Sequence, residues 1–500
     1  MMTANTLQPS CSLKDLFADI AEISNDISVT GIAIDSRLVK TGDLFMAYTG
    51  TNQNGVDFIP NAIEAGAVAI AVEEDALIDE IENSIEVIRV NNLRQSVGVI
   101  ASRFFGQPSE TFNVIGVTGT NGKTTVAYMI MQALNAAKKE SAFIGTLGYG
   151  TNSLIHQGSM TTPDPIQLHS LFSTWRNELH SAVMEVSSHA LDQGRVNGTA
   201  FNIAVFTNLS RDHLDYHNTV EEYAAAKSLL FTMPDLKHAV INADDTYGKD
   251  LIALLNNNIS IVAFSTDPEI KIKNTKHVNV VDIKASSDRQ KLITIESEWG
   301  RAQITTSLLG EFNISNILAV FSVLCLSGLT ALQAADAISG FYGVPGRMEC
   351  FSNNEKAMLV VDYAHTPDAL EKALVSLRPY CEGKLYCVFG CGGDRDIGKR
   401  PEMGAIAESY ADVVVLTNDN PRTEKPERII SQILAGMQNK ERVAVRYDRS
   451  DAIINTYLET NFGDIVLIAG KGHETTQTIG DEIAPFSDRE LARRLVEVNA

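Results

Sequence analysis

The chain has 500 residues, 44% of them hydrophobic and 21% charged, which predicts about three globular domains and excludes a disordered chain. Its 62 acidic residues outnumber its 41 lysines and arginines, and the resulting net charge of −21 argues against general binding to nucleic acids or acidic membranes. A local basic pocket for an anionic substrate remains compatible with this charge.

The chain shows no sign of secretion or of a membrane span. Residues 1–16 contain no basic start followed by an apolar run, so we expect no signal peptide. The most apolar stretch, 317–329, is too short to span a bilayer. The six cysteines form no zinc-binding set. We therefore predict a cytoplasmic protein with free thiols, no membrane insertion and no nucleic-acid partner.

Glycine and proline gather at 106–109 and at 342–346, each time after a helical pattern. Because these residues end helices and begin turns, the two joints predict three domains with the boundaries 1–107, 108–342 and 343–500.

Eight short apolar runs are each followed at once by polar residues that can bind or react. The runs are 114–117, 182–184, 203–206, 239–241, 359–361, 386–389, 413–416 and 465–468. Continuous apolar runs that alternate with helical patterns are typical of buried parallel strands, and open α/β sheets bind ligands just beyond their strand ends. We therefore predict α/β sheets with ligand-binding carboxyl edges in the second and third domains.

The first run opens into a glycine-rich loop that leads into a helix. The loop residues are Gly119, Thr120, Asn121, Gly122, Lys123, Thr124 and Thr125. Such a loop turns backbone N–H groups toward phosphate oxygens, while Lys123 neutralises phosphate charge and Thr124 can bind Mg²⁺. The general pattern places a glycine at position 117, whereas this chain has glycines at 116 and 119. The loop is therefore a variant phosphate loop.

This variant resembles the ATP-binding loop of the Mur ligases and of the related folylpolyglutamate synthetases, which form amide bonds through an acyl phosphate. The resemblance covers nearly the whole chain, in the family's motif order. It implies a three-domain α/β fold with a small N-terminal uridine-nucleotide domain, a central P-loop domain and a C-terminal Rossmann-like domain. It also implies ATP and Mg²⁺ as cofactors, and we expect a monomer.

The segment Asp35-Ser36-Arg37 resembles the uridine-nucleotide domain of family members that extend the peptidoglycan stem, which implies that Ser36 lies near the uracil or pyrophosphate. Where relatives often have Asp-Gly-His, this chain has Asn54-Gly55-Val56. The resemblance also implies contacts to the muramoyl peptide. Among these contacts is Arg195, whose planar, always charged guanidinium suits a carboxylate or a pyrophosphate. The muramoyl-peptide contacts that the resemblance implies are Thr161, Thr162, Ser187, Gln193 and Arg195.

The resemblance also implies a magnesium site. Its ligands would be Glu185 and His213, together with Thr124 of the loop. Lys227, taken alone, would be a solvated helix lysine, but the resemblance implies a carbamylated lysine whose carbamate bridges a second Mg²⁺. The neighbouring imidazoles at 189 and 217 are interpreted as structural hydrogen-bonding groups.

Further residues resemble the family's contacts around the nucleotide. They are Asn242, Asp244, Asn313, Asn316, Arg347 and Asp362. The asparagines at 313 and 316 could equally cap the following helix. Arg347 would neutralise phosphate charge and Asp362 would accept from ribose hydroxyls, which requires the third domain to close on the second.

The amino-acid pocket is expected to decide the substrate. Asp419-Asn420-Pro421-Arg422 matches the motif of family members that add meso-diaminopimelate, and lysine-adding relatives lack this arginine. The chemistry agrees, because a guanidinium can bind the distal carboxylate that lysine does not have. The resemblance adds Arg395, Gly470 and Glu474 as contacts to the distal zwitterion, with Glu474 meeting its ammonium.

We therefore hypothesise that the chain joins meso-diaminopimelate to UDP-N-acetylmuramoyl-L-alanyl-D-glutamate. Three alternatives remain open. A lysine-adding ligase is disfavoured by Arg422, and a folylpolyglutamate synthetase should lack the Asp35-Ser36-Arg37 domain. A nucleotide-binding regulator would hydrolyse ATP without ligation. A nicotinamide oxidoreductase is disfavoured because the segment 390–393 lacks the third glycine of its motif, with Arg395 in that place.

Overall fold

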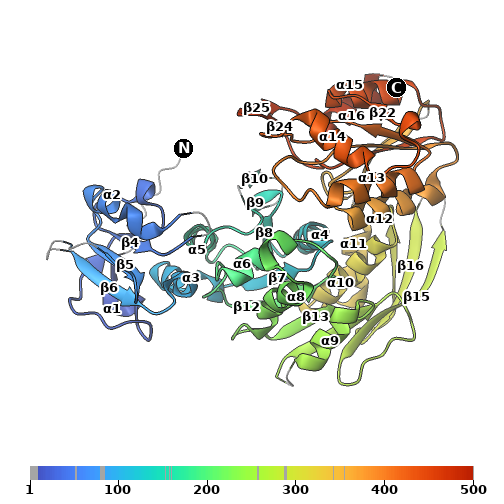
Figure 1. Ribbon diagram of the computed structural model, residues 1–500. Helices are drawn as coiled ribbons and strands as arrows, with labels where there is room; N and C mark the ends of the chain where they lie inside the picture. The colour runs from blue at the N-terminus through green and yellow to red at the C-terminus, as the bar shows by residue number, and fades with distance from the viewer. Residues whose placement is uncertain are drawn as a thin grey trace.

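The computed structural model describes residues 10–498, apart from 51–52, 79–80, 82–84, 152–153, 157, 159, 256–257, 286–289, 342 and 354. Tyr342, at which the second domain is predicted to end, lies outside the described residues, as do residues 1–9 of the segment in which no signal peptide is expected. Figure 1 shows an N-terminal part in blue, a central part from cyan to yellow and a C-terminal part in orange and red.

The N-terminal part is built on a four-stranded parallel sheet with the order β3-β4-β5-β6. Alternate residues of its strands pack into two separate apolar layers, one with α1 and α3 and the other with α2. The strands and helices are β1 (Cys11–Ser12), α1 (Leu13–Leu16), β2 (Ser28–Val29), β3 (Gly31–Ala33), β4 (Asp43–Ala47), α2 (Ile59–Glu64), β5 (Ala69–Glu73), β6 (Glu86–Val90) and α3 (Leu93–Phe104).

The central part contains an eleven-stranded sheet with the order β10-β9-β8-β11-β7-β12-β13-β14-β15-β16-β17. Its middle strands are parallel, and antiparallel strands continue it at both edges. The strands are β7 (Asn113–Thr118), β8 (Ser141–Gly145), β9 (Gly148–Thr151), β10 (Leu154–His156), β11 (Ser181–Glu185), β12 (Phe201–Phe206), β13 (His238–Asn242), β14 (Ser260–Ser265), β15 (Lys276–Ala285), β16 (Lys291–Ser297) and β17 (Ala302–Thr306).

Helices cover both faces of this sheet, so its parallel strands are buried on both sides. One face packs on α4, α10 and α11, and the other on α5, α6 and α9. The helices of the central part are α4 (Lys123–Ala136), α5 (Pro165–Thr174), α6 (Ser188–Asp192), α7 (Leu214–His217), α8 (Val220–Ser228), α9 (Thr246–Leu254), α10 (Phe312–Leu326) and α11 (Ala331–Ser339).

The C-terminal part has a six-stranded sheet with the order β18-β19-β23-β20-β21-β22, in which only the edge strand β18 is antiparallel. A separate hairpin, β24–β25, forms its own two-stranded sheet and meets the rest of the C-terminal part through an isolated bridge between Ile479 and Arg422. The elements are β18 (Glu349–Phe351), β19 (Met358–Asp362), α12 (Pro367–Leu377), β20 (Leu385–Phe389), α13 (Lys399–Tyr410), β21 (Val413–Leu416), α14 (Pro426–Leu434), β22 (Ala444–Val445), α15 (Arg449–Leu458), β23 (Ile465–Ala469), β24 (Thr476–Ile479), β25 (Glu482–Pro485) and α16 (Asp488–Val498).

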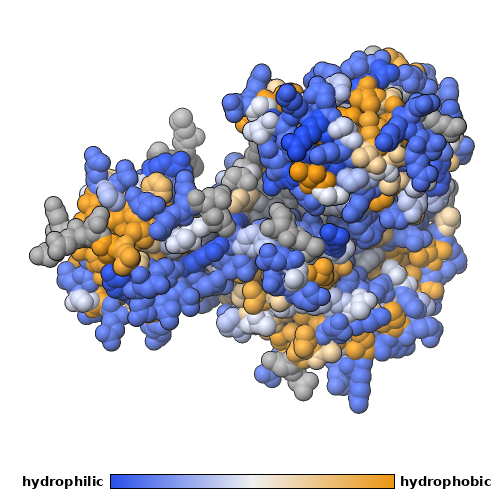
Figure 2. All heavy atoms as spheres, viewed as in Figure 1, coloured by the Kyte–Doolittle hydropathy of each residue, from blue (hydrophilic) through white to orange (hydrophobic). Residues whose placement is uncertain are grey.

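The predicted α/β fold class is confirmed, and all eight apolar runs lie in parallel strands: β7, β11, β12, β13, β19, β20, β21 and β23. The apolar stretch 317–329 lies mostly in α10, which is buried in the core of the central part. Among the described residues, no helix is long and apolar enough to cross a membrane. Figure 2 shows a mostly hydrophilic surface on the viewed face, with apolar side chains gathered over the N-terminal part and in smaller patches elsewhere.

Candidate functional site

The predicted phosphate loop joins β7 to α4. Gly119 has a φ of 144°, and a Cβ atom there would lie 2.0 Å from Thr207 Oγ1, so only glycine fits this bend. Lys123 Nζ donates to the carbonyl oxygens of Gly119 and Thr120, both at 2.8 Å. The lysine ammonium therefore lies folded over the loop, and burial lowers its pKa despite the nearby carboxylates of Glu185 and Asp212.

Glu185 is the last residue of β11, which pairs with β7 in parallel, so its side chain emerges beside the loop. Only 1% of Glu185 is exposed. Its carboxylate accepts hydrogen bonds from Thr124 Oγ1 at 2.9 Å and from the backbone N–H of Thr146 at 2.7 Å. The structure thus brings Thr124 and Glu185 together, and both offer the oxygen donors that Mg²⁺ prefers.

The interpretation of Lys227 as a solvated helix lysine is wrong, because only 1% of this residue is exposed. It lies on the face of α8 that packs against the phosphate loop, where its Nζ donates to Gly119 O at 2.8 Å. The same Nζ lies 4.2 Å from the centre of the Tyr223 ring. Burial lowers the pKa of Lys227 well below its usual value, and the charge of Lys123 lowers it further, with Asp212 acting in the opposite direction.

His213 lies at the start of α7 with a φ of 54°, and its Nε2 is 3.4 Å from a carboxylate oxygen of Asp212. Its ring centre is 6.0 Å from that of Tyr223, the residue whose ring also faces Lys227. His217 hydrogen-bonds Ser188 Oγ at 2.9 Å, which agrees with a structural role. In the described part of the chain, no three His, Cys, Asp or Glu side chains form a metal-binding group.

The C-terminal part meets the phosphate loop through two side chains. Arg347 donates to Thr124 Oγ1 at 3.2 Å, and Asp368 at the start of α12 accepts from Asn121 Nδ2 at 2.8 Å. The guanidinium of Arg347 lies 4.3 Å from the centre of the Tyr363 ring. Burial lowers the pKa of His473, whose ring packs against Tyr363, to about 4. This imidazole is therefore neutral and does not repel the guanidinium.

Most of the other residues predicted to surround the nucleotide make hydrogen bonds within the protein. Asn242 donates to Thr207 O at 2.7 Å, and Asn313 donates to Leu309 O at 2.7 Å. Asp362 accepts from the backbone N–H groups of two residues, and burial raises its pKa. Asn316 Oδ1 lies 2.7 Å from the place where a Cβ of Gly122 would be, so it does lie against the loop. Asp244 accepts from the backbone N–H and hydroxyl of Thr266.

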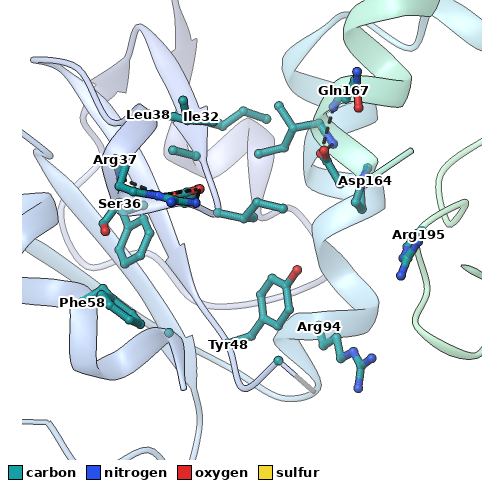
Figure 3. A pocket seen from close by; sticks show the side chains of 18 of the residues that line it. Ile32, Ser36, Arg37, Leu38, Tyr48, Phe58, Arg94, Asp164, Gln167 and Arg195 are labelled. Carbon is teal, nitrogen blue, oxygen red and sulfur yellow. Dashed lines mark hydrogen bonds and ion pairs between the residues drawn. The ribbon is translucent and has the colours of Figure 1, made fainter. Parts of the chain in front are cut away.

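A cavity of 1220 Å³ lies between the N-terminal and central parts (Figure 3). It is lined by Ser36 on one side and by Gln193 and Arg195 on the other, three of the residues predicted to contact the UDP substrate. Figure 3 also shows Tyr48 and Arg94 facing this space. The Asn54-Gly55-Val56 segment contributes Gly55 to the lining, and Asn54 caps the short helical turn that follows.

The remaining predicted contacts connect this cavity to the phosphate loop. Arg195 donates to Thr162 O at 3.2 Å, and Thr162 Oγ1 donates to the backbone carbonyl of Glu185 at 2.9 Å. The same Thr162 hydroxyl accepts from the N–H of Ser187 at 3.1 Å. Thr161 Oγ1 lies 3.2 Å from Thr146 Oγ1, and the backbone N–H of Thr146 donates to the carboxylate of Glu185. Hydrogen bonds therefore connect Thr161, Thr162, Ser187 and Arg195 of the predicted UDP-substrate set to Glu185 and Thr124 of the predicted metal set.

Five of the six residues predicted to bind the amino acid form a cluster at the carboxyl edge of the six-stranded sheet. Asn420 Nδ2 donates to Glu474 at 2.9 Å, and a Cβ at Gly470 would lie 2.4 Å from Asp419 Oδ2. Arg422 donates through Nη1 to Gly393 O at 2.8 Å. Arg395 is exposed, although its side chain lies near the same glycine-rich turn as Arg422. Burial raises the pKa of Asp419.

The comparison with known proteins agrees with this arrangement. The chain is 47% identical over 474 residues, 94% of its length and 96% of the relative's, to a Coxiella burnetii protein named UDP-N-acetylmuramoyl-L-alanyl-D-glutamate–2,6-diaminopimelate ligase. Family models match as "Mur ligase family, catalytic domain" at 28–105, "Mur ligase middle domain" at 117–324 and "Mur ligase, glutamate ligase domain" at 346–472.

This chain belongs to the Mur ligase family. A Chromobacterium violaceum Mur ligase of the same name is 43% identical over 472 residues, covering 93% of this chain and 94% of the relative. A solved structure of a ligase with that name superposes with a TM-score of 0.71 at 35% identity, covering 98% of this chain and 99% of the other. The three-domain Mur ligase architecture is therefore shown by both sequence and structure.

The sequence analysis of this Mur ligase missed several residues of the site. Tyr48 and Arg94 line the cavity, and Asp368 reaches the phosphate loop. Lys471 hydrogen-bonds Asn420 and Glu474 within the cluster predicted to bind the amino acid. Lys471 could have been singled out, because it stands between Gly470 and Glu474 in the sequence. The other three carry no local pattern that points to a ligand.

The Thr162 hydroxyl gives a test of the Mur ligase network. Thr162→Val should lower the free energy of unfolding by about 1–3 kcal/mol, because the buried N–H of Ser187 and carbonyl of Glu185 lose their partner. Urea unfolding of the variant measures this change. Thr174→Val, on an exposed hydroxyl at the end of α5, is the matched control and should change stability little. Equal effects of the two substitutions would contradict the network.

Proposed function

We propose that this chain is the ligase that joins meso-2,6-diaminopimelate to UDP-N-acetylmuramoyl-L-alanyl-D-glutamate with ATP. The relatives that are 43–47% identical over more than nine-tenths of the chain carry this activity in their names. The observation that carries the proposal is that one chain holds three sites: the phosphate loop, the cavity lined by Arg195, and the side-chain cluster with Arg422.

The reaction has two steps. The γ-carboxylate of the substrate's D-glutamate attacks the γ-phosphate of ATP, which forms an acyl phosphate and releases ADP. The amine of diaminopimelate then attacks the acyl carbon, the C–O bond to phosphate breaks, and the amine gives up a proton. Both steps are catalysed mainly by positioning and charge neutralisation. The positions of Lys123 and Arg347 at the loop support this role for their positive charges.

The residues at the loop fit divalent cations in donor chemistry. Thr124 and Glu185 supply oxygens, His213 would supply a nitrogen, and a carbamate on Lys227 would supply two further oxygens. Bound Mg²⁺ would offset the negative charge of the phosphates. The nucleotide contacts proposed for Asn242, Asn313 and Asp362 would require their present internal hydrogen bonds to be shared with the ligand.

The lowered pKa of Lys227 supports carbamylation, because only a neutral amine attacks CO₂ to form the N–C bond with release of a proton. Protein equilibrated with ¹³C-bicarbonate should show a carbamate carbonyl resonance that is missing from Lys227→Met. The signal should fade as the pH falls, because protonation of the amine returns CO₂. Lys249→Met, on the exposed face of α9, is the control and should keep the signal. A resonance that survives in Lys227→Met would refute this assignment.

The whole function is tested by measuring phosphate release from ATP and Mg²⁺ with UDP-N-acetylmuramoyl-L-alanyl-D-glutamate. Release and a tripeptide product of the expected mass should appear with meso-diaminopimelate and not with L-lysine. A preference for lysine would overturn the role of Arg422. ATP hydrolysis without either co-substrate would instead favour the alternative that the protein is a nucleotide-binding regulator that hydrolyses ATP without ligation.

The proposal extends to the organisation of the enzyme. Residues 1–107 would bind the uridine nucleotide, 108–342 ATP, and 343–500 the incoming amino acid. All the proposed site residues come from one chain, so a monomer would suffice for catalysis. ATP and UDP-linked substrates are cytoplasmic metabolites, which supports a cytoplasmic location.

A further inference from the structure

A fully buried lysine lies within the amino-acid pocket. The side chain of Lys471 is 0% exposed, and its Nζ donates to Glu474 Oε2 at 2.7 Å and to Asn420 Oδ1 at 3.1 Å. An ammonium group at such a site requires partners, because transfer of a charge out of water is costly. Here both partners are residues proposed to touch the incoming amino acid.

The three side chains form a closed triangle of hydrogen bonds. Asn420 Nδ2 donates to the same Glu474 oxygen that Lys471 reaches, at 2.9 Å. Asn420 Oδ1 also accepts from the backbone N–H of Thr478 at 3.0 Å. The amide oxygen of Asn420 is thereby fixed as the acceptor, and its NH₂ group must point toward Glu474. Lys471 thus holds Glu474 and, together with the N–H of Thr478, the amide of Asn420.

The triangle also sets the charge of the pocket. Glu474 is partly exposed, with 31% of its side chain accessible, whereas Lys471 lies behind it. Burial opposes ionisation of Glu474, but Lys471 and Asn420 together keep its pKa below its usual value. A carboxylate that is held ionised and is partly exposed suits the ammonium of an amino acid.

We propose that Lys471 is a positioning residue for the amino-acid substrate, holding Asn420 and Glu474 in the orientation that binds the distal zwitterion. This inference rests on the proposed function. Lys471 does not itself touch the substrate, because its ammonium is enclosed by its two partners. Its loss should therefore weaken binding of the amino acid and leave the two nucleotide substrates unaffected.

The test compares wild type, Lys471→Met, Glu474→Gln and the double variant by steady-state kinetics with each of the three substrates. Lys471→Met should raise KM for diaminopimelate by about tenfold or more, with KM for ATP and for the UDP substrate within about twofold. The double variant should bind diaminopimelate about as weakly as the worse single variant, because the two side chains act as a unit.

Lys440→Met, on an exposed lysine of the same part of the chain, is the matched control and should match wild type. If Lys471→Met does not fold, Lys471→Gln keeps a hydrogen-bond donor at this position and serves the same comparison. An unchanged KM for diaminopimelate, an equal rise for all three substrates, or additive effects in the double variant would each overturn the proposal.

Wild type is measured first, so that the two proposals can fail separately. If wild type ligates a different amino acid, the proposed substrate is wrong, and the same KM ratios are then measured with the amino acid that is used.

Discussion

Replacing Lys123 by alanine is expected to lower kcat at least about 1000-fold while the protein stays folded. The ammonium of Lys123 lies over the loop, on the carbonyl oxygens of Gly119 and Thr120, where it can reach the phosphate charge that grows during transfer. A methyl group in its place leaves that charge without a fixed cation. Phosphate release under saturating substrates measures the loss.

The stability of the same variant separates a catalytic effect from misfolding. Burial lowers the pKa of Lys123, so the ammonium is held in the folded protein at a cost. Its removal should therefore leave the free energy of unfolding unchanged or slightly higher. Lys249→Ala, on an exposed lysine of α9, should match wild type in both measurements. Wild-type activity in Lys123→Ala would rule out ATP chemistry at this loop.

Replacing Arg422 by alanine is expected to raise KM for meso-diaminopimelate by about 10–100-fold, since a hydrogen bond to a charged group contributes roughly 1.5–3 kcal/mol. Within the part of the chain that the structure describes, the guanidinium of Arg422 donates from Nη1 to Gly393 O, so its other N–H groups can bind the distal carboxylate. KM for ATP and for the UDP substrate should not change. Competition between diaminopimelate and L-lysine measures the loss of selectivity directly.

Arg428→Ala on α14 is the control for this substitution, because it removes an exposed arginine close in sequence. It should leave all three KM values unchanged. If Arg422→Ala binds diaminopimelate as tightly as wild type, the distal carboxylate is bound elsewhere, with Arg395 as the next guanidinium to test.

The eight strands that were predicted are correct because each is a continuous apolar run, and the polar residues beyond them do gather at the sheet edges. It could not place Lys227. The helix α8 has no strong apolar face, and the lysine is buried only because α8 packs on a loop more than 100 residues earlier in the chain. Burial that arises from tertiary packing leaves no local pattern.

The polar residues around the nucleotide show a second limit. Asn313 could be interpreted as a nucleotide contact or as a helix cap, and Asp362 was predicted to accept from ribose hydroxyls. In the structure their side chains satisfy backbone groups of neighbouring segments. Arg94 and Tyr48 were missed because the cavity they line forms only when two separate sheets come together.

The hairpin β24–β25 has a consequence for how selectivity can change. It lies outside the six-stranded sheet, yet Thr478 O accepts from the N–H of Arg422 at 3.2 Å and Gly480 N donates to Arg422 O at 2.7 Å. The left-handed backbone of Arg422, with a φ of 52°, is thus held from both sides by a short, largely exposed ribbon. Substitutions in this hairpin could therefore move the backbone of Arg422, and with it the selectivity for the amino-acid substrate, while the packed sheet beneath keeps its sequence.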